Sequence, residues 1–377
     1  MNEQVYTNYR LQLPEQEILG TLVVRDRLIA DIQPGVVAIG QNGGGDYLLP
    51  GLIELHTDNL ECCVSPRPGV RWSVEAAAAY HDLATISAGI TTVCDAIAVG
   101  SVNSHSLRLT HFAAMIDAIC HGQVAGDFVA EHRLHLRCEL SYDQAYYVAA
   151  QYADCPLLSL ISLMDHAPGD RQFVSTDKFE KYYVGKYGVA ADRISTLTQI
   201  WQQEHHHHAS VNRTAIAQLA QLKGITLASH DDTTVSHIQQ AVQDKVAIAE
   251  FPTTLAAAKA AKSSGLQVLV GAPNLVLEGS QSGNVAAKQL VEQGLVDIIS
   301  SDYAPQSLLH AIFLISRYLN QPIYKVMRLA TSNPAQAIHL EHDRGSLAIG
   351  KRADLIAVRD RSVPQLTAVI CRGNRVA

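Results

Sequence analysis

The chain lacks several features that mark common protein classes. No uninterrupted apolar run approaches the roughly 18 residues of a membrane-spanning helix, so no such helix is expected. The N-terminus has no basic start followed by an apolar run, so we expect no signal peptide. The 7 cysteines are odd in number, scattered and without a CxxC pair, which argues against a disulfide framework or a zinc ribbon and predicts reduced thiols in a cytoplasmic protein.

Further absences narrow the choice of fold and ligand. No GxGxxG or P-loop motif opens an expected helix, and no repeat of roughly 20 to 50 residues is visible, which disfavours dinucleotide-binding sheets and solenoids. An excess of positive charge is also missing, since 29 Lys and Arg stand against 36 Asp and Glu, for a net charge of −7. The sequence therefore gives no electrostatic reason to expect nucleic acid or an anionic membrane as a partner.

What the 377 residues do contain is apolar material for a large core, because hydrophobic residues make up 47% of them. Eight strand-like runs alternate with helical patterns and predict an α/β fold, a (β/α)8 barrel of the TIM type, with a doubly wound sheet as the main alternative. The expected strands are residues 48–55, 90–95, 133–140, 157–164, 225–229, 246–250, 268–270 and 296–300. Further strand-like runs lie near both chain ends, at residues 18–24, 28–32, 354–358 and 368–371.

Several of the expected barrel strands end abruptly in histidine or aspartate. The first ends in His56-Thr57-Asp58, and because alternate residues of a strand share a side, His56 and Asp58 can reach one ion together. The fourth, fifth and eighth strands end in His166, His230 and Asp302. One such histidine is more often a hydrogen-bonded structural residue than a ligand. The combination favours a metal centre, because the carboxyl ends of barrel strands form the active site and these side chains suit Zn²⁺.

The third expected strand carries charged side chains on one face. Its alternation places Arg133, His135, Arg137 and Glu139 together, opposite an apolar face that can pack on helices. Burying the polar face is costly unless its charges meet partners or a metal. A solvated edge strand is the alternative explanation for the same pattern.

Motifs near both ends of the chain resemble the amidohydrolase superfamily. They are LPGLIELHTD, the aspartate at the eighth strand and the tail GxxxxGKRADL. The usual first motif of that superfamily is His-x-His, from which His56-Thr57-Asp58 departs. His-x-Asp in place of His-x-His is part of a second resemblance. Several sequence blocks, which occur in the same order over nearly the whole chain, are similar to the PhnM-type α-D-ribose 1-methylphosphonate 5-triphosphate diphosphatases. The blocks are PGLIELHTDNLE, EHRLHLRCEL, SLMDHAPGDRQF, ASHDD, AEFPTT, GAPN, SGNVAA and SSDY.

This resemblance implies a fold and a reaction. It implies a metal-dependent hydrolase barrel over residues 49–344, with a small β-sandwich built from residues 1–48 and 345–377. The implied reaction, in phosphonate catabolism by the carbon–phosphorus lyase pathway, hydrolyses a small 5-triphosphate to the 5-phosphate and pyrophosphate. The implied cofactor is divalent, zinc or alternatively manganese, in one or two copies. Neither nucleic acid nor a membrane is implied, and homo-oligomer formation stays open.

The resemblance also implies roles for residues at the strand ends. His56 and Asp58 would bind the more buried metal, and His166 and His230 would complete the site. Many relatives have a modified lysine as the bridge, and here Glu139 takes that place, with Asp165 as the competitor. Asp302 would bind metal and take a proton from the attacking water. The role of Glu250, at the end of the sixth strand where many relatives have histidine, stays open.

A triphosphate needs a locally positive site in this acidic chain. Arginine grips phosphate oxygens with two donors and lysine acts as a point charge. Helix N-termini also present N–H groups to anions, although ordinary capping explains the same residues. The expected substrate contacts are Arg133, His135, Arg137, Arg171, Lys186, Ser282 and Asn284. For Lys186 and its neighbouring lysines, a solvated helix face is the alternative.

Two other functions and one motif remain open. A metal-dependent amide hydrolase, for example a deacetylase, is the alternative activity, although a neutral amide needs no paired arginines. The third hypothesis is a barrel without catalytic activity, which predicts little bound metal. The run from His205 to His208 is internal, so it is not an obvious tag, and such a run is typical of a solvated loop.

Overall fold

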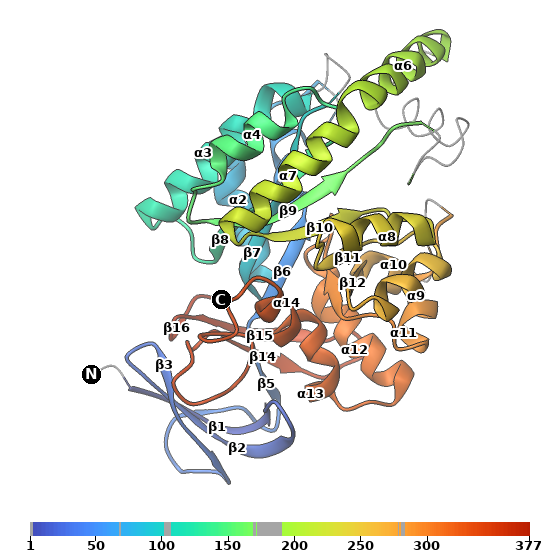
Figure 1. Cartoon of the computed structure of the whole chain (residues 1–377). Helices are drawn as coiled ribbons and strands as arrows, with labels where there is room; N and C mark the ends of the chain where they lie inside the picture. The colour runs from blue at the N-terminus through green and yellow to red at the C-terminus, as the bar shows by residue number, and fades with distance from the viewer. Residues whose placement is uncertain are drawn as a thin grey trace.

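The computed structural model describes residues 3–67, 69–101, 107–168, 171, 191–277, 279 and 283–377. Its larger part is a barrel of eight parallel strands that follow one another in chain order (Figure 1). They are β6 (Leu52–Thr57), β7 (Ile90–Val99), β8 (Glu131–Glu139), β9 (Leu158–Met164), β10 (Thr226–His230), β11 (Ile248–Glu250), β12 (Gln267–Gly271) and β13 (Ile298–Ser300). A parallel bridge between Thr57 and Asp302 brings the first strand to the last. The predicted (β/α)8 barrel is confirmed, and the doubly wound alternative is wrong.

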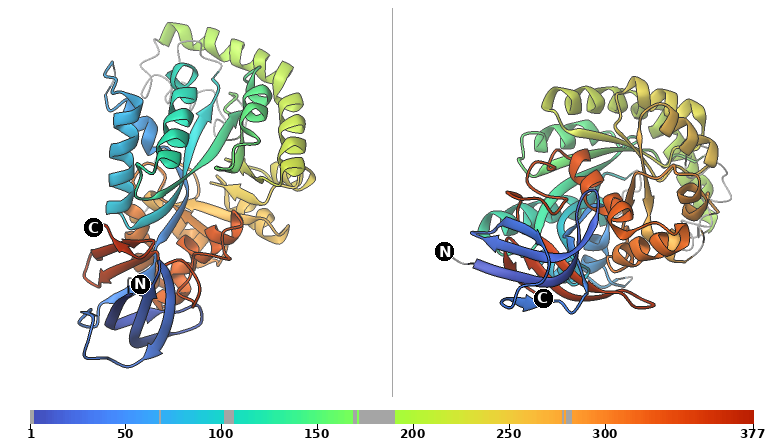
Figure 2. Two further views of the ribbon diagram at one scale, coloured as in Figure 1. Left: turned by 90° about the vertical axis from the view of Figure 1, so that its left-hand side faces the viewer. Right: turned by 90° about the horizontal axis from the view of Figure 1, so that it is seen from below.

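Helices cover the outside of the barrel (Figures 1 and 2). They are α1 (Asn59–Val64), α2 (Val74–Ser87), α3 (Leu107–Ala125), α4 (Ala145–Tyr152), α6 (Ala191–Glu204), α7 (Ser210–Lys223), α8 (Val235–Gln243), α9 (Leu255–Ser263), α10 (Ala272–Val276), α11 (Ala287–Glu292), α12 (Ser307–Leu319), α13 (Ile323–Val326) and α14 (Ser332–Ala337). Ser73, Thr234 and Thr254 start α2, α8 and α9 by accepting a hydrogen bond from the first turn. Within the described ranges, no helix combines the length and apolar character needed to cross a bilayer.

An apolar layer inside the barrel lies next to the polar strand ends. Ala228 and Ile248 belong to a buried apolar cluster that Ala335 of α14 joins. Two residues further along the same strands come His230 and Glu250, which therefore lie on the same side of each strand. The barrel interior thus changes from apolar to polar within one step of the alternation, and the polar layer lies at the carboxyl ends.

A second sheet combines the two ends of the chain. Its order is β16-β15-β14-β5-β1-β2-β3, with β4 beside β1. The strands are β1 (Glu3–Gln12), β2 (Glu17–Arg25), β3 (Leu28–Pro34), β4 (Gln41–Asn42), β5 (Tyr47–Pro50), β14 (Leu355–Arg359), β15 (Gln365–Cys371) and β16 (Asn374–Arg375). N- and C-terminal strands pair directly where β14 lies antiparallel to β5. The predicted second β unit from both termini is therefore confirmed, and both termini lie at its end of the molecule (Figures 1 and 2).

The single strand expected at residues 48–55 is a wrong prediction, because Gly51 divides it. β5 pairs with the second sheet, while β6 belongs to the barrel. A Cβ on Gly51 would lie 2.2 Å from Thr91 Oγ1, so only glycine allows the chain to pass this close to the neighbouring segment. One apolar run therefore serves two sheets, which periodicity alone does not reveal.

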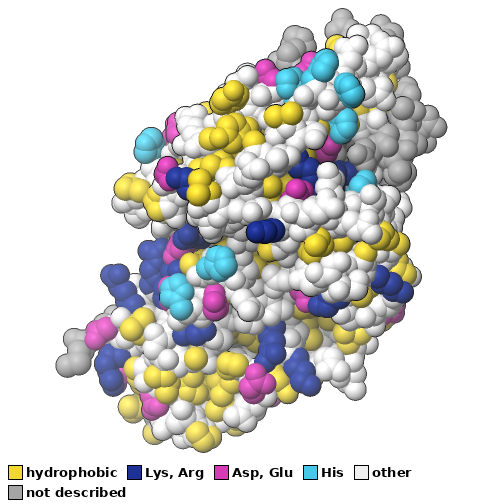
Figure 3. Space-filling model, viewed as in Figure 1, with side chains coloured by type: hydrophobic (Ala, Val, Ile, Leu, Met, Phe, Trp, Pro, Cys, Tyr) yellow, Lys and Arg dark blue, Asp and Glu magenta, His cyan; other side chains and the backbone are white. Residues whose placement is uncertain are grey.

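The run of four histidines is helical rather than a solvated loop. His205–Ala209 forms a π-helical turn that continues from α6 into α7. His206 and His207 are exposed, and Figure 3 shows exposed histidine side chains close together in the region where α6 and α7 lie in Figure 1. His205 differs from them, because its Nδ1 lies 3.0 Å from Asp165 Oδ2.

Candidate functional site

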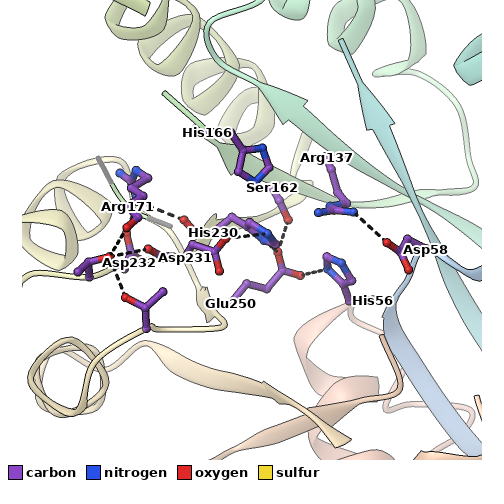
Figure 4. A network of polar contacts seen from close by, with 12 residues as sticks. His56, Asp58, Arg137, Ser162, His166, Arg171, His230, Asp231, Asp232 and Glu250 are labelled. Atoms are coloured by element: carbon purple, nitrogen blue, oxygen red, sulfur yellow. Dashed lines mark hydrogen bonds and ion pairs between the residues drawn. The ribbon is translucent and has the colours of Figure 1, made fainter. Parts of the chain in front are cut away.

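Two histidines and a glutamate meet at the carboxyl ends of three barrel strands (Figure 4). We call His56 of β6, His230 of β10 and Glu250 of β11 the mouth group. Glu250 Oε1 is 2.8 Å from His56 Nδ1, and Oε2 is 3.0 Å from His230 Nδ1. All three side chains are buried. One ligand atom from each lies within 4.8 Å of the others, a spacing that can hold a metal ion.

Burial and neighbours set the protonation of the mouth group. Burial lowers the pKa of His230. Burial alone would raise the pKa of Glu250, but the contact with His56 holds it well below its usual range. At neutral pH the group therefore offers a carboxylate and a neutral imidazole, which are the forms that bind a divalent ion.

His135 lies behind Glu250 rather than in open contact with a ligand. Its Nδ1 is 2.9 Å from the Leu55 carbonyl oxygen, which can only accept, so Nδ1 carries the proton. Its Nε2 faces Ser162 Oγ, which also lies 2.6 Å from Glu250 Oε2. The ring has no exposed surface, and burial lowers its pKa to about 3. The expected phosphate contact is therefore a buried side chain whose two ring nitrogens face Leu55 and Ser162 within the protein.

A second group of potential ligands shares His230. His166, His230 and Asp231 also bring ligand atoms within 4.8 Å of one another. Glu139 Oε2 lies 3.0 Å from His166 Nδ1, so the third and fourth strands meet here. Because His230 offers Nδ1 to Glu250 and Nε2 to Asp231, 3.5 Å away, its two nitrogens face two neighbouring positions. The strand ends can thus accommodate one or two ions.

A buried arginine lies beside these groups. Arg137, on β8, is only 6% exposed, and its Nη1 is 3.9 Å from Asp58 Oδ2 (Figure 4). Among the described residues, neither Nε nor Nη1 of Arg137 has a hydrogen-bond partner. A buried guanidinium with unused donors is costly unless an anion completes it. Asp58 lies just beyond β6 as the residue that starts α1, so the strand alternation expected for His56 and Asp58 ends between them.

Asp302 reaches the site through the closure of the barrel. Its backbone N–H donates to the His56 carbonyl, 3.1 Å away, and its carbonyl accepts from Thr57 Oγ1 at 2.6 Å. Its φ of 54° lies in the left-handed region, which costs energy for a residue other than glycine. A Cβ on Gly271 would lie 3.9 Å from Asp302 Oδ2, which places this carboxylate over the end of β12. The closure thus brings Asp302 next to His56.

Comparisons with known proteins agree with this arrangement. The model of the amidohydrolase family matches residues 190–376. The chain is 43% identical over 363 residues to an "Alpha-D-ribose 1-methylphosphonate 5-triphosphate diphosphatase" of Escherichia coli (strain K12), covering 93% of this chain and 94% of the relative. The chain belongs to this diphosphatase family. The family falls within the amidohydrolases, whose members are metal-dependent hydrolases.

More distant relatives share either a short sequence segment or only the fold with this chain. An adenine deaminase of Clostridium botulinum is 33% identical over 92 residues, 23% of this chain and 15% of the relative. The crystal structure of N-acetylglucosamine-6-phosphate deacetylase from Pasteurella multocida covers 100% of both chains with a TM-score of 0.65 and 13% identity. The deacetylase structure from Mycobacterium smegmatis has a TM-score of 0.67 at 12% identity and covers 100% of this chain and 99% of that one. The likeness to the two deacetylase structures concerns the fold of the whole chain.

Three of the residues predicted for the site lie away from the mouth group or contact other side chains. Arg133 lies at the start of β8, where it contacts Glu131, Ser159 and the Pro156 carbonyl, so the structure does not bring it to the strand ends. Asp165 faces His205, whereas its competitor Glu139 contacts His166. Arg171, 3% exposed, pairs with Asp232 and donates to the His230 carbonyl.

The structure says less about the remaining residues that were expected to contact the substrate. Lys186 and Ser282 lie outside the described residues. Asn284 lies ahead of α11, whose first N–H, that of Ala287, donates to the Asn274 side chain at 3.2 Å. The first N–H of α11 is therefore bonded to a side chain of the protein itself.

Two carboxylates of the site had no assigned role in the sequence, namely Glu54 and Asp231. Glu54 has no exposed surface and accepts hydrogen bonds from the backbone N–H groups of His56, at 2.7 Å, and Ser301. Burial raises its pKa to about 7. The sequence feature that could have predicted a role for Glu54 is its position two residues before His56 in a buried strand. Asp231 directly follows His230, and burial raises its pKa too.

Proposed function

We propose that this protein hydrolyses α-D-ribose 1-methylphosphonate 5-triphosphate to the 5-phosphate and pyrophosphate in phosphonate catabolism. The observation that carries the proposal is the 43% identity to the diphosphatase along 93% of the chain. Arg137 supports it independently, because a buried guanidinium with unused donors suits a phosphate and has no purpose toward a neutral amide.

The residues present fit a divalent ion. Neutral imidazoles and carboxylates are the donors that zinc takes, and manganese is the alternative. Asp231 Oδ2 is buried and, among the described residues, has no hydrogen bond beyond its 3.5 Å ion-pair contact with His230 Nε2, so it can bind an ion. When bound, such an ion supplies Lewis-acid activation of water and phosphoryl oxygen. The proposed ligands are His56, Asp58, Glu139, His166, His230 and Asp302, to which the geometry adds Glu250 and Asp231.

The protein's own side chains have distinct tasks in this reaction. Arg137 binds the triphosphate and offsets the charge of its oxygens. The Asp302 carboxylate takes the proton of the water that attacks phosphorus, while the bond to the pyrophosphate leaving group breaks. Glu54 holds the backbone of His56 and Ser301, and so keeps the first and last strands in register beside Asp302.

Pyrophosphate release tests the proposal. Purified protein loaded with Zn²⁺ or Mn²⁺ and given ribose methylphosphonate triphosphate is expected to release pyrophosphate, and a chelator is expected to stop the release. The matched pair Arg137→Ala and Arg137→Lys separates loss of charge from loss of the planar donor fork. Orthophosphate as the sole product contradicts the proposal. Turnover of an N-acetylated sugar phosphate in place of the triphosphate supports the alternative amide hydrolase instead, since the solved deacetylases share the fold.

The proposal has three further parts. The protein acts in the cytoplasm on a small triphosphate, without nucleic acid or membrane as partners, as its net charge of −7 and its reduced cysteines favour. The barrel unit comprises residues 49–344, and residues 1–48 with 345–377 form the second unit. One or two ions occupy the strand ends, and metal analysis of the purified protein counts them.

A further inference from the structure

A second group of buried histidine and aspartate side chains lies outside the barrel interior. Asp95 of β7 alternates with Val93 and Ile97, which pack in the layer between strands and helices, so Asp95 also points toward the helices. His132 of β8 faces the same layer by the same rule. His81 reaches them from α2. We call His81, Asp95 and His132 the outer group.

The contacts of the outer group form one continuous chain. Asp95 Oδ1 is 2.7 Å from His81 Nε2, and Asp95 Oδ2 is 2.7 Å from His132 Nδ1. On the far side of each ring, His81 Nδ1 is 3.1 Å from Asn59 Nδ2, and His132 Nε2 is 3.3 Å from Asp82 Oδ1. The three members have no exposed surface.

The charge of this cluster needs compensation. Asp82 is 3% exposed and Asp95 fully buried, and across the described chain their ion pairs are with His81 and His132 alone. A buried carboxylate is stabilised by positive charge or by hydrogen-bond donors nearby. A divalent cation bound among His81, Asp95 and His132 supplies positive charge close to both carboxylates.

The donor geometry suits a cation. Each oxygen of Asp95 faces one imidazole nitrogen, so this carboxylate lies between the rings of His81 and His132. One ligand atom from each of the three residues lies within 4.8 Å of the others, as in the mouth group. The far ring nitrogen of His132 lies 3.3 Å from Asp82 Oδ1, and histidines that bind metals are commonly oriented by a carboxylate in this way.

We propose that His81, Asp95 and His132 bind a structural divalent cation, zinc by its donor set, in addition to the ions of the barrel mouth. The ion joins α2 to β7 and β8. Asp82 extends the connection, because its carboxylate also accepts the backbone N–H groups of Val129 and Ala130 at 3.0 and 2.9 Å. Full burial makes this a closed site without a position for substrate, so the proposal does not depend on the reaction at the mouth.

Anomalous scattering on crystals of the wild-type protein tests the site directly. Data collected at the zinc absorption edge after zinc loading are expected to give a peak among His81, Asp95 and His132, in addition to density at the mouth group. A peak at the mouth group with none at the outer group overturns the proposal. No variant is involved, so a folding defect cannot obscure this result.

A solution experiment removes the competing histidines first. The background protein carries His56→Ala and His230→Ala at the mouth, and His206→Ala and His207→Ala in the exposed run. After zinc loading and dialysis, elemental analysis is expected to find about one zinc per chain, as a closed structural site holds its ion. A zinc content no higher than that of a zinc-free blank overturns the proposal.

Matched variants in that background assign the bound zinc. Adding Asp95→Asn with His132→Gln keeps the shapes of the side chains and is expected to remove the zinc. Adding His342→Ala, an exposed histidine, is expected to leave it in place. Equal zinc in both proteins contradicts the assignment. Circular dichroism checks that each variant is folded, and the wild-type crystal decides if one is not.

Discussion

The mouth group and the outer group place the same chemistry in two different settings. In each, a buried carboxylate lies between two imidazoles, at 2.8 and 3.0 Å around Glu250 and at 2.7 Å on both sides of Asp95. The mouth group stands where strands end, beside Arg137 with its unused donors. The outer group is enclosed by α2 and by the contacts of Asp82. We infer that the same donor set takes part in the reaction where strand ends leave room for a ligand, and holds a structural ion where helices close over it.

The largest expected effect is a loss of catalytic activity on substitution of Asp302 beside the mouth group, with no comparable loss on substitution in the outer group. Asp302→Asn keeps the shape of the side chain but cannot take a proton, so kcat is expected to fall by about 10²- to 10⁴-fold. Metal analysis of the same protein is expected to show its ions retained. Loss of metal together with activity makes Asp302 chiefly a ligand, and the matched variant His132→Gln in the outer group is expected to change kcat far less.

The dependence of the free energy of unfolding on pH tests the contacts of the outer group. The pKa of His132 is raised to about 9 in the folded protein, above its ordinary value of 6.5. A raised pKa means that the stabilisation is fully present below pH 6.5 and is lost as the pH rises through 9. In metal-free protein, the free energy of unfolding is expected to fall by about 3 kcal/mol over this window.

Urea unfolding at several pH values measures this slope. His132→Gln is expected to abolish it. Zinc-loaded protein is expected to show a flatter profile, because the ion replaces the protons that the titration removes. A slope that survives in His132→Gln assigns it to other groups.

Arg137 allows a test of the mouth alone. Charge-assisted hydrogen bonds contribute about 1.5–3 kcal/mol, so Arg137→Ala is expected to raise KM for the triphosphate by about 10- to 100-fold. Binding of a monophosphate is expected to weaken less, and Arg137→Lys to recover part of the loss. Steady-state kinetics and competition by inorganic phosphate measure both. Equal loss for mono- and triphosphate makes Arg137 structural.

The smallest expected effect comes from the histidine run. His207 is exposed, so His207→Ala is expected to change the free energy of unfolding by no more than about 0.5 kcal/mol and to leave kcat unchanged. Thermal unfolding and the pyrophosphate assay measure the two quantities. A larger change gives the run a role that neither the mouth group nor the outer group explains.

The barrel and much of its mouth were predictable from local sequence. Apolar runs that stop at His166, His230 and Asp302 indicate both the strands and their carboxyl ends, since alternation and burial act over a few residues. Arg133 illustrates the limit of the same rule. It shares a strand face with Arg137 and Glu139, but a position four residues earlier on the strand is enough to place it at the other end of the barrel, with Glu131 and Ser159.

The outer group left no comparable signal. His81 comes from a helix, Asp95 from the middle of a strand and His132 from the beginning of the next, so no spacing relates them. Glu250 likewise gained a partner only when β6, β10 and β11 were brought together. Contacts between residues far apart in the chain depend on which strands become neighbours, and this is set by the closure of the barrel.

By itself, the sequence determined the alternation of strands and helices, the family motifs and the polar residues at strand ends, because these follow from periodicity and chemistry within short segments. Only the tertiary structure decided which side chains meet. It divided the first run at Gly51 between two sheets, set Arg137 beside Asp58, turned His135 inward beside Glu250, and assembled His81, Asp95 and His132. The physical reason is that charge compensation in a buried space depends on distance in three dimensions, which the order of residues does not specify.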